Sequence, residues 1–143
     1  MSESLEDSVL KSLVWDDLLQ WWSSEFDLSP NRRVEIFISP ENGSPDEPSE
    51  LFSWVRAGLM RIQSTDHEYR RWTAAQVIDT RWNTEEPMTV EEITDLLRLA
   101  SIDFHPDGSA GLYWDDQDRL YGGHNLITEL DNDGKCIEVR MEG

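Results

Sequence analysis

The sequence predicts a single α+β domain, in which antiparallel strands flank a central block of about three helices that packs on one face of a sheet. The chain has 143 residues, a common size for one domain with one core. Apolar residues come in short, roughly alternating groups in the first and last thirds, which is typical of strands. In the middle third they recur every three to four residues, which is typical of amphipathic helices.

The N-terminal part predicts a meander of strands. Residues 1–8 combine acids and serines with few apolar side chains, so we expect a flexible N-terminus and a single domain over 9–143. Between Leu13 and Ile38 the apolar groups are interrupted by two aspartates at 16–17 and by a Ser-Pro-Asn turn. This pattern predicts three antiparallel strands.

Three helical patterns follow a proline-rich connection. They predict helices over 51–62, 69–82 and 89–100, the first two separated by a polar Ser-Thr-Asp break. The third begins with Thr89 and Glu92 at the spacing of a capping box, in which each side chain accepts a hydrogen bond from the other residue's backbone N–H.

The last third predicts a second meander. Turn sequences stand at Pro-Asp-Gly (106–108) and Asp-Asn-Asp-Gly (131–134), between short apolar runs. We expect strands near 102–104, 112–114, 126–130 and 137–141.

Acids dominate the composition, with 30 Asp and Glu against 12 Lys and Arg and a formal charge of −18. Such a field repels phosphate backbones and anionic membranes and attracts cations, so we expect a basic protein as partner and no direct contact with nucleic acid or membrane. The sequence has no long apolar run, no secretory leader pattern and one cysteine, Cys136. We therefore expect a cytoplasmic protein, with the oligomeric state left open.

One segment carries residues with catalytic chemistry: Asp115, Asp116, Asp118 and His124 lie within ten positions. Carboxylates and an imidazole on one hairpin can form a metal site or an acid–base pair. Alternatively the segment is an acidic hairpin loop, and His124 is a half-buried strand residue bonded to a neighbour. No established catalytic or phosphate-binding motif accompanies it, so we predict no catalytic residue, metal or cofactor and favour a protein that is not an enzyme.

A second candidate feature is the pair Trp21 and Trp22. Adjacent residues of a strand point to opposite faces of the sheet, so one of the two indoles must meet solvent, a helix or a partner. The pair is therefore a candidate interaction surface.

The C-terminal half, roughly residues 89–128, resembles a family of uncharacterised bacterial proteins, a domain of unknown function. The resemblance rests on a capped helix, a strand, an Asp-Gly-Ser turn, an aromatic strand and an Asp-Asp-x-Asp to Gly-His segment, which here read TVEEITDLLRLASIDFHPDGSAGLYWDDQDRLYGGHNLI. It implies one α+β domain of bacterial origin and names no activity.

Taken together, these features favour a non-enzymatic interaction module, immunity- or inhibitor-like, that binds a basic partner. The alternative is a small enzyme or metal-binding domain that uses the hairpin from Asp115 to Asp118 together with His124.

Overall fold

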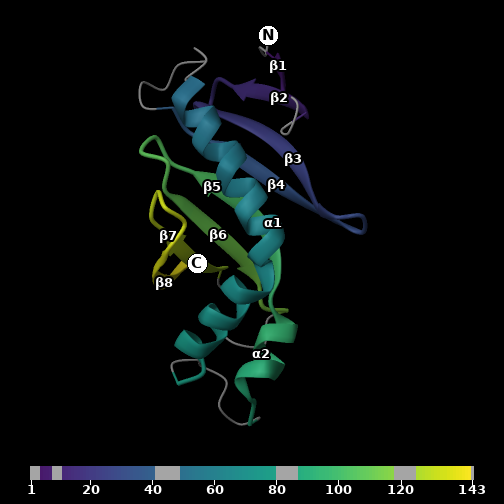
Figure 1. Ribbon diagram of the computed structural model, residues 1–143, viewed down its shortest axis with the longest axis vertical. Helices are drawn as coiled ribbons and strands as arrows, with labels where there is room; N and C mark the ends of the chain where they lie inside the picture. Colours follow the sequence, from purple (N-terminus) through teal and green to yellow (C-terminus); the bar gives the residue numbers. More distant parts are fainter. Residues whose placement is uncertain (1–3, 8–10, 41–48, 80–86, 118–124, 143) are drawn as a thin grey trace.

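A computed structural model describes residues 4–7, 11–40, 49–79, 87–117 and 125–142. Two helices and eight strands make up this part of the chain (Figure 1). In chain order they are β1 (Ser4–Asp7), β2 (Lys11–Asp16), β3 (Trp21–Ser29), β4 (Arg32–Ile38), α1 (Ser49–Val77), α2 (Val90–Leu96), β5 (Arg98–Phe104), β6 (Ala110–Asp115), β7 (Asn125–Leu130) and β8 (Cys136–Glu142).

The strands form one sheet in the order β1 to β8, so each strand lies next to its neighbour in the chain. Every pair is antiparallel except β4 and β5, which are parallel. Parallel neighbours need a long crossover, and α1 and α2 supply it between β4 and β5. The sheet is therefore two meanders joined side by side at one parallel pair, which confirms an α+β fold with a mostly antiparallel sheet.

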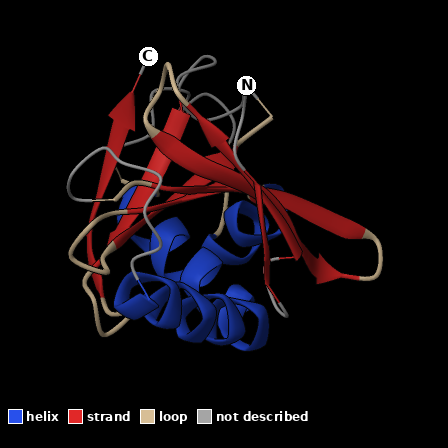
Figure 2. Cartoon of the chain, turned by 90° about the horizontal axis from the view of Figure 1, so that it is seen from above, coloured by secondary structure: helices blue, strands red, loops and turns tan. Residues whose placement is uncertain are grey.

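Both helices cover the same face of the sheet, and the opposite face carries no helix (Figure 2). Strand alternation decides which side chains meet the helices: in β4, Val34 and Ile36 are buried, whereas Arg33 and Glu35 are exposed. The buried strand residues pack with an apolar stripe of α1 formed by Phe52, Val55, Leu59 and Ile62. We call the opposite side the helix-free face.

The described residues contain two helices where we predicted about three, and this part of the prediction is wrong. The two patterns over 51–62 and 69–82 share α1, which bends at Thr65, where φ is −126° and ψ is 19°. Thr65 Oγ1 and Ser64 Oγ both donate to the carbonyl of Arg61, at 2.7 and 3.0 Å. Such local bonds compete with the helical ladder, so the polar break kinks the helix without ending it.

The capping box of α2 is confirmed, but the helix is shorter than predicted. Thr89 Oγ1 accepts from the Glu92 N–H, and Glu92 Oε1 accepts from the Thr89 N–H, both at 3.2 Å. Leu97 is already extended, and β5 begins at Arg98. Pairing with both β4 and β6 converts the expected end of the helix into a strand.

The remaining strand predictions agree with the structure. The three strands expected between Leu13 and Ile38 are β2, β3 and β4, and the four expected in the last third are β5 to β8. Strand structure was expected from about residue 9. In the structure it begins earlier, with β1, which pairs with β2. Among the described helices, none is long and apolar enough to span a membrane.

Candidate functional site

In the described part of the predicted hairpin site, one carboxylate is exposed and the next is buried. Asp115 is exposed and accepts a 2.8 Å hydrogen bond from the backbone N–H of Gln117, whereas Asp116 is 4% exposed. The two adjacent carboxylates therefore lie in different environments, and a joint role for them stays a prediction. Asp118 and His124 lie outside the described residues, and their role stays a prediction.

The two adjacent tryptophans also have different environments. Trp22 is fully buried and makes edge contacts with Trp15 and Phe52, at ring-centroid distances of 5.4 and 6.3 Å. Trp21 is half-buried and packs on Phe37 of β4, at a centroid distance of 4.6 Å. Trp22 as an interaction residue is a wrong prediction, because it belongs to the core. Trp21 stays a candidate.

The helix-free face carries a groove of about 490 Å³ over β2, β3 and β4. Phe37, which contacts Trp21, and the exposed Val14 supply its apolar wall. Serines and charged residues supply the rest of the lining: Ser12, Ser23, Ser24, Glu25, Asp27, Arg33 and Glu35. The groove is thus part apolar and part acidic. Sequence reasoning missed it, although alternation in the predicted strands already puts Glu25, Asp27, Arg33 and Glu35 on one face.

Charge in the groove is organised around Arg33. Its Nε donates to Asp27 Oδ1 at 3.0 Å and its Nη1 to Glu25 Oε2 at 3.2 Å. The bond to Asp27 and the charges of Asp27 and Glu25 raise the pKa of Arg33. Glu35 lies directly across from Glu25 in the antiparallel register, and among the described residues no base pairs with Glu35. Like charges opposite one another are unfavourable, so this pair favours an additional cation.

A second polar cluster occupies the C-terminal half of the same face. Arg140 donates to Glu129 from Nε and to Glu142 from Nη1, both at 2.7 Å. His105 Nε2 lies 3.7 Å from Glu129 Oε2, and the Tyr113 hydroxyl donates to Glu142 at 3.4 Å. Together with Asp103 we call these residues the Arg140 cluster. The turn and aromatic patterns of the sequence predicted the strands that carry these residues. The pairing of β5, β6, β7 and β8 is what brings the polar side chains together.

A model of a bacterial family, described as an uncharacterized protein conserved in bacteria (DUF2262), matches residues 7–141. The chain belongs to this family. Comparison with curated proteins and with solved structures finds no match. The match spans both meanders and the helices, so the groove and, except for Glu142, the Arg140 cluster of this DUF2262 protein lie within the family region.

Among the described residues of the DUF2262 protein, no group of three or more His, Cys, Asp or Glu side chains has the arrangement of a metal site. The Arg140 cluster instead behaves as a hydrogen-bonded ion network. Burial raises the pKa of Asp103 from its ordinary 3.8, an effect partly opposed by a hydrogen bond from Tyr113 and by His105. Burial, followed by the charges of Asp103 and Glu142, raises the pKa of Tyr113.

The shift at Asp103 predicts how Asp103→Asn changes stability with pH. A carboxyl group whose pKa is higher in the folded state binds more protons there, so its contribution to stability is present below the unfolded pKa and is lost as pH rises through the folded pKa. Asparagine does not ionise and keeps a polar side chain with a carbonyl acceptor at the same position. We expect the variant to gain stability relative to wild type as pH rises from about 4 to about 7. Urea unfolding across this range measures the difference, and a difference that does not vary with pH contradicts the prediction.

Proposed function

We propose that this protein is a non-enzymatic interaction module, immunity- or inhibitor-like, whose helix-free face binds a cationic segment of a partner protein. The observation that carries the proposal is the groove, where the carboxylates of Glu25, Asp27 and Glu35 stand beside the apolar wall of Phe37 and Val14. Apolar area supplies affinity, and carboxylates select a positive charge.

Arg33 already occupies the acidic side of the groove and shows how a guanidinium group binds to the carboxylates there. One guanidinium bridges carboxylates on two neighbouring positions of one face, Glu25 and Asp27. A partner's arginine beside Glu35 would relieve the repulsion between Glu35 and Glu25 in the same way. The Trp21 and Phe37 rings next to it can also contact a guanidinium through their π faces.

The C-terminal half of the helix-free face also carries paired acids. Glu129 lies directly across from Glu138, as Glu25 does from Glu35, so strand pairing places acids opposite each other twice on this face. The negative field of a protein with a net charge of −18 speeds the approach of a basic partner and weakens as salt is added.

The test is binding of a fluorescent arginine-rich peptide, followed by anisotropy at low and at physiological salt. The groove variant Glu25→Gln, Asp27→Asn, Glu35→Gln is compared with a control that changes the net charge equally at exposed positions on or just after the helices: Glu68→Gln, Asp79→Asn, Asp95→Asn. We expect the groove variant to weaken binding about tenfold or more, since charged hydrogen bonds are lost, and the control to weaken it less than about twofold.

Two results would overturn the proposal. Equal weakening by both triple variants would mean that the peptide responds only to net charge, and no binding at low salt would mean that the groove does not select cations. A Phe37→Ala variant tests the apolar wall separately: it should weaken binding at physiological salt, where the long-range field is screened.

A further inference from the structure

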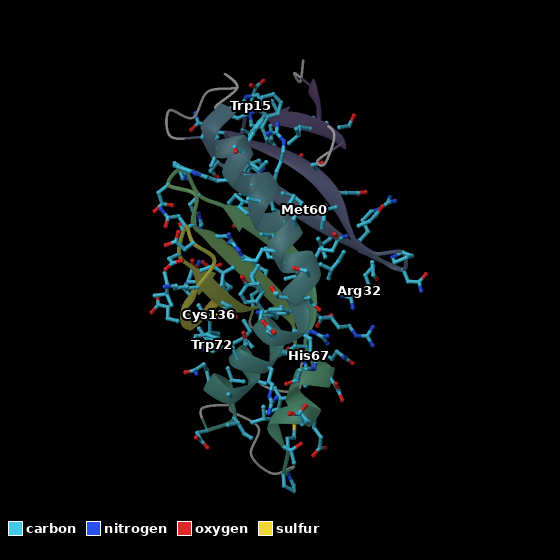
Figure 3. All side chains as sticks on the ribbon, in the orientation of Figure 1. Trp15, Arg32, Met60, His67, Trp72 and Cys136 are labelled. Atoms are coloured by element: carbon cyan, nitrogen blue, oxygen red, sulfur yellow. The ribbon has the colours of Figure 1, made fainter. Side chains whose placement is uncertain are left out.

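A pocket of about 290 Å³ lies where the kink of α1 meets the end of β3, the start of β4 and the start of β5. Its lining includes three arginines from three different elements, Arg32, Arg70 and Arg98, and one acid, Asp66. Figure 3 shows Arg32 on the side of the molecule where the β3–β4 hairpin projects beyond α1. The residues of this pocket differ from those of the acidic groove.

Two of the guanidiniums are held in place by the fold. Arg32 Nη2 donates to the backbone carbonyl of Leu99 at 3.1 Å, which ties the start of β4 to β5. Arg70 Nε lies 3.0 Å from Asp66 Oδ2, and Arg70 Nη1 donates to the carbonyl of Thr94 at 3.4 Å. Each contact uses part of a group that carries five N–H donors, so donors remain for a ligand.

The pocket is rich in positive charge, although the protein as a whole is strongly negative. Acids outnumber bases 30 to 12 in the chain, yet the pocket gathers three arginines around one carboxylate. Among the described residues, no carboxylate forms an ion pair with Arg32 or Arg98. Clustered cations repel each other, so the arrangement favours an anion between them.

Two buried polar atoms at this pocket are also unsatisfied. Asp66 Oδ1 and Arg70 Nε have no hydrogen-bond partner among the described residues, although Arg70 Nε lies 3.0 Å from Asp66 Oδ2 in an ion pair. A buried polar atom without a partner is costly, so such atoms often mark a place where a ligand or water binds.

We propose that this pocket binds a small oxyanion, the phosphate of a monoester or a carboxylate. Guanidinium groups match both anions through paired N–H donors, and a volume of about 290 Å³ suits a small metabolite. The unsatisfied Asp66 Oδ1 would accept from a hydroxyl or ammonium group of the same ligand, which favours a hydroxy acid, an amino acid or a sugar phosphate.

The experiment is titration calorimetry of the whole chain in chloride buffer with two probes, inorganic phosphate and malonate. The variants are Arg32→Gln and Arg98→Gln, and the matched control is Arg71→Gln, which makes the same change of charge next to Arg70 at a position 63% exposed. We expect saturable binding of at least one probe, weakened about tenfold or more by each pocket variant and unchanged by the control.

The two probes distinguish the ligand classes, since preferential binding of phosphate assigns a phosphate ester and preferential binding of malonate assigns a carboxylate. No saturable binding of either probe would overturn the proposal. Binding that Arg71→Gln weakens as much as Arg32→Gln would also overturn it, because the anion would then respond to net charge alone. Circular dichroism of each variant checks that it is folded. These outcomes are independent of the peptide test, because different residues are altered.

Discussion

Replacing Trp22 by alanine is expected to lower the free energy of unfolding by about 3–5 kcal/mol, the range seen when a large aromatic side chain is removed from a core. Trp22 has no exposed surface, and it contacts Trp15 of β2 and Phe52 of α1. The indole therefore joins the N-terminal meander to the long helix. Because small domains are stable by only about 5–15 kcal/mol, this loss should be visible in the midpoint of urea unfolding.

Two further substitutions make the prediction specific. Trp21→Ala removes the adjacent indole from the helix-free face, where it is half-buried, and should cost clearly less than Trp22→Ala. Trp22→Phe keeps a ring in the core and removes Trp22 Nε1, a buried donor without a partner among the described residues. Removing the unpaired donor is favourable and partly offsets the packing contacts that the smaller ring loses. We therefore expect Trp22→Phe to lower the free energy of unfolding much less than Trp22→Ala does. Equal losses for Trp21→Ala and Trp22→Ala would contradict this assignment of faces.

Replacing Thr128 by valine is expected to cost about 1–3 kcal/mol of stability, although it changes little volume, because it leaves a buried donor unpaired. Trp114 Nε1 donates to Thr128 Oγ1 at 2.8 Å, and the hydroxyls of Thr128 and Thr73 lie 2.5 Å apart. Thr73 uses its own proton on the carbonyl of Tyr69, so Thr128 must donate to Thr73. The chain of bonds connects β6, β7 and α1 through the core.

The matched control for this prediction is Thr94→Val. Thr94 is also fully buried, but its hydroxyl only donates to the Val90 carbonyl one turn earlier in α2. Removing that bond leaves no unpaired donor, so the cost should stay below about 1 kcal/mol. Chemical unfolding of both variants provides the comparison. A cost for Thr128→Val no larger than for Thr94→Val would show that the bond to Trp114 contributes little.

Local patterns predicted much of the fold because their causes are local. The Thr89 and Glu92 capping box involves residues three positions apart, and it is present as predicted. The turns at Gly108 and Gly134 have φ of +87° and +82°, a conformation that glycine adopts without strain. Alternation of buried and exposed residues in β4 follows from the two-residue period of any strand.

The candidate sites were less predictable, because they depend on which strands become neighbours. Glu25 and Glu35 are ten positions apart, and only the register of β3 and β4 places them opposite each other. The pocket arginines Arg32, Arg70 and Arg98 are still more distant in sequence. Proximity in sequence instead favoured Asp115 and Asp116, of which the first is exposed and the second is buried.

The sequence by itself determined the α+β class, the two meanders, the capped helix and the acidic charge, because periodicity, turn residues and composition act over a few positions. Tertiary structure alone decided that Trp22 is buried and Trp21 is not, since either face of β3 could have received the helices. It also decided the parallel pairing of β4 with β5 and the gathering of arginines in an acidic protein. These features arise from packing between segments far apart in the chain, where the free energy of burying a shared core outweighs local preference.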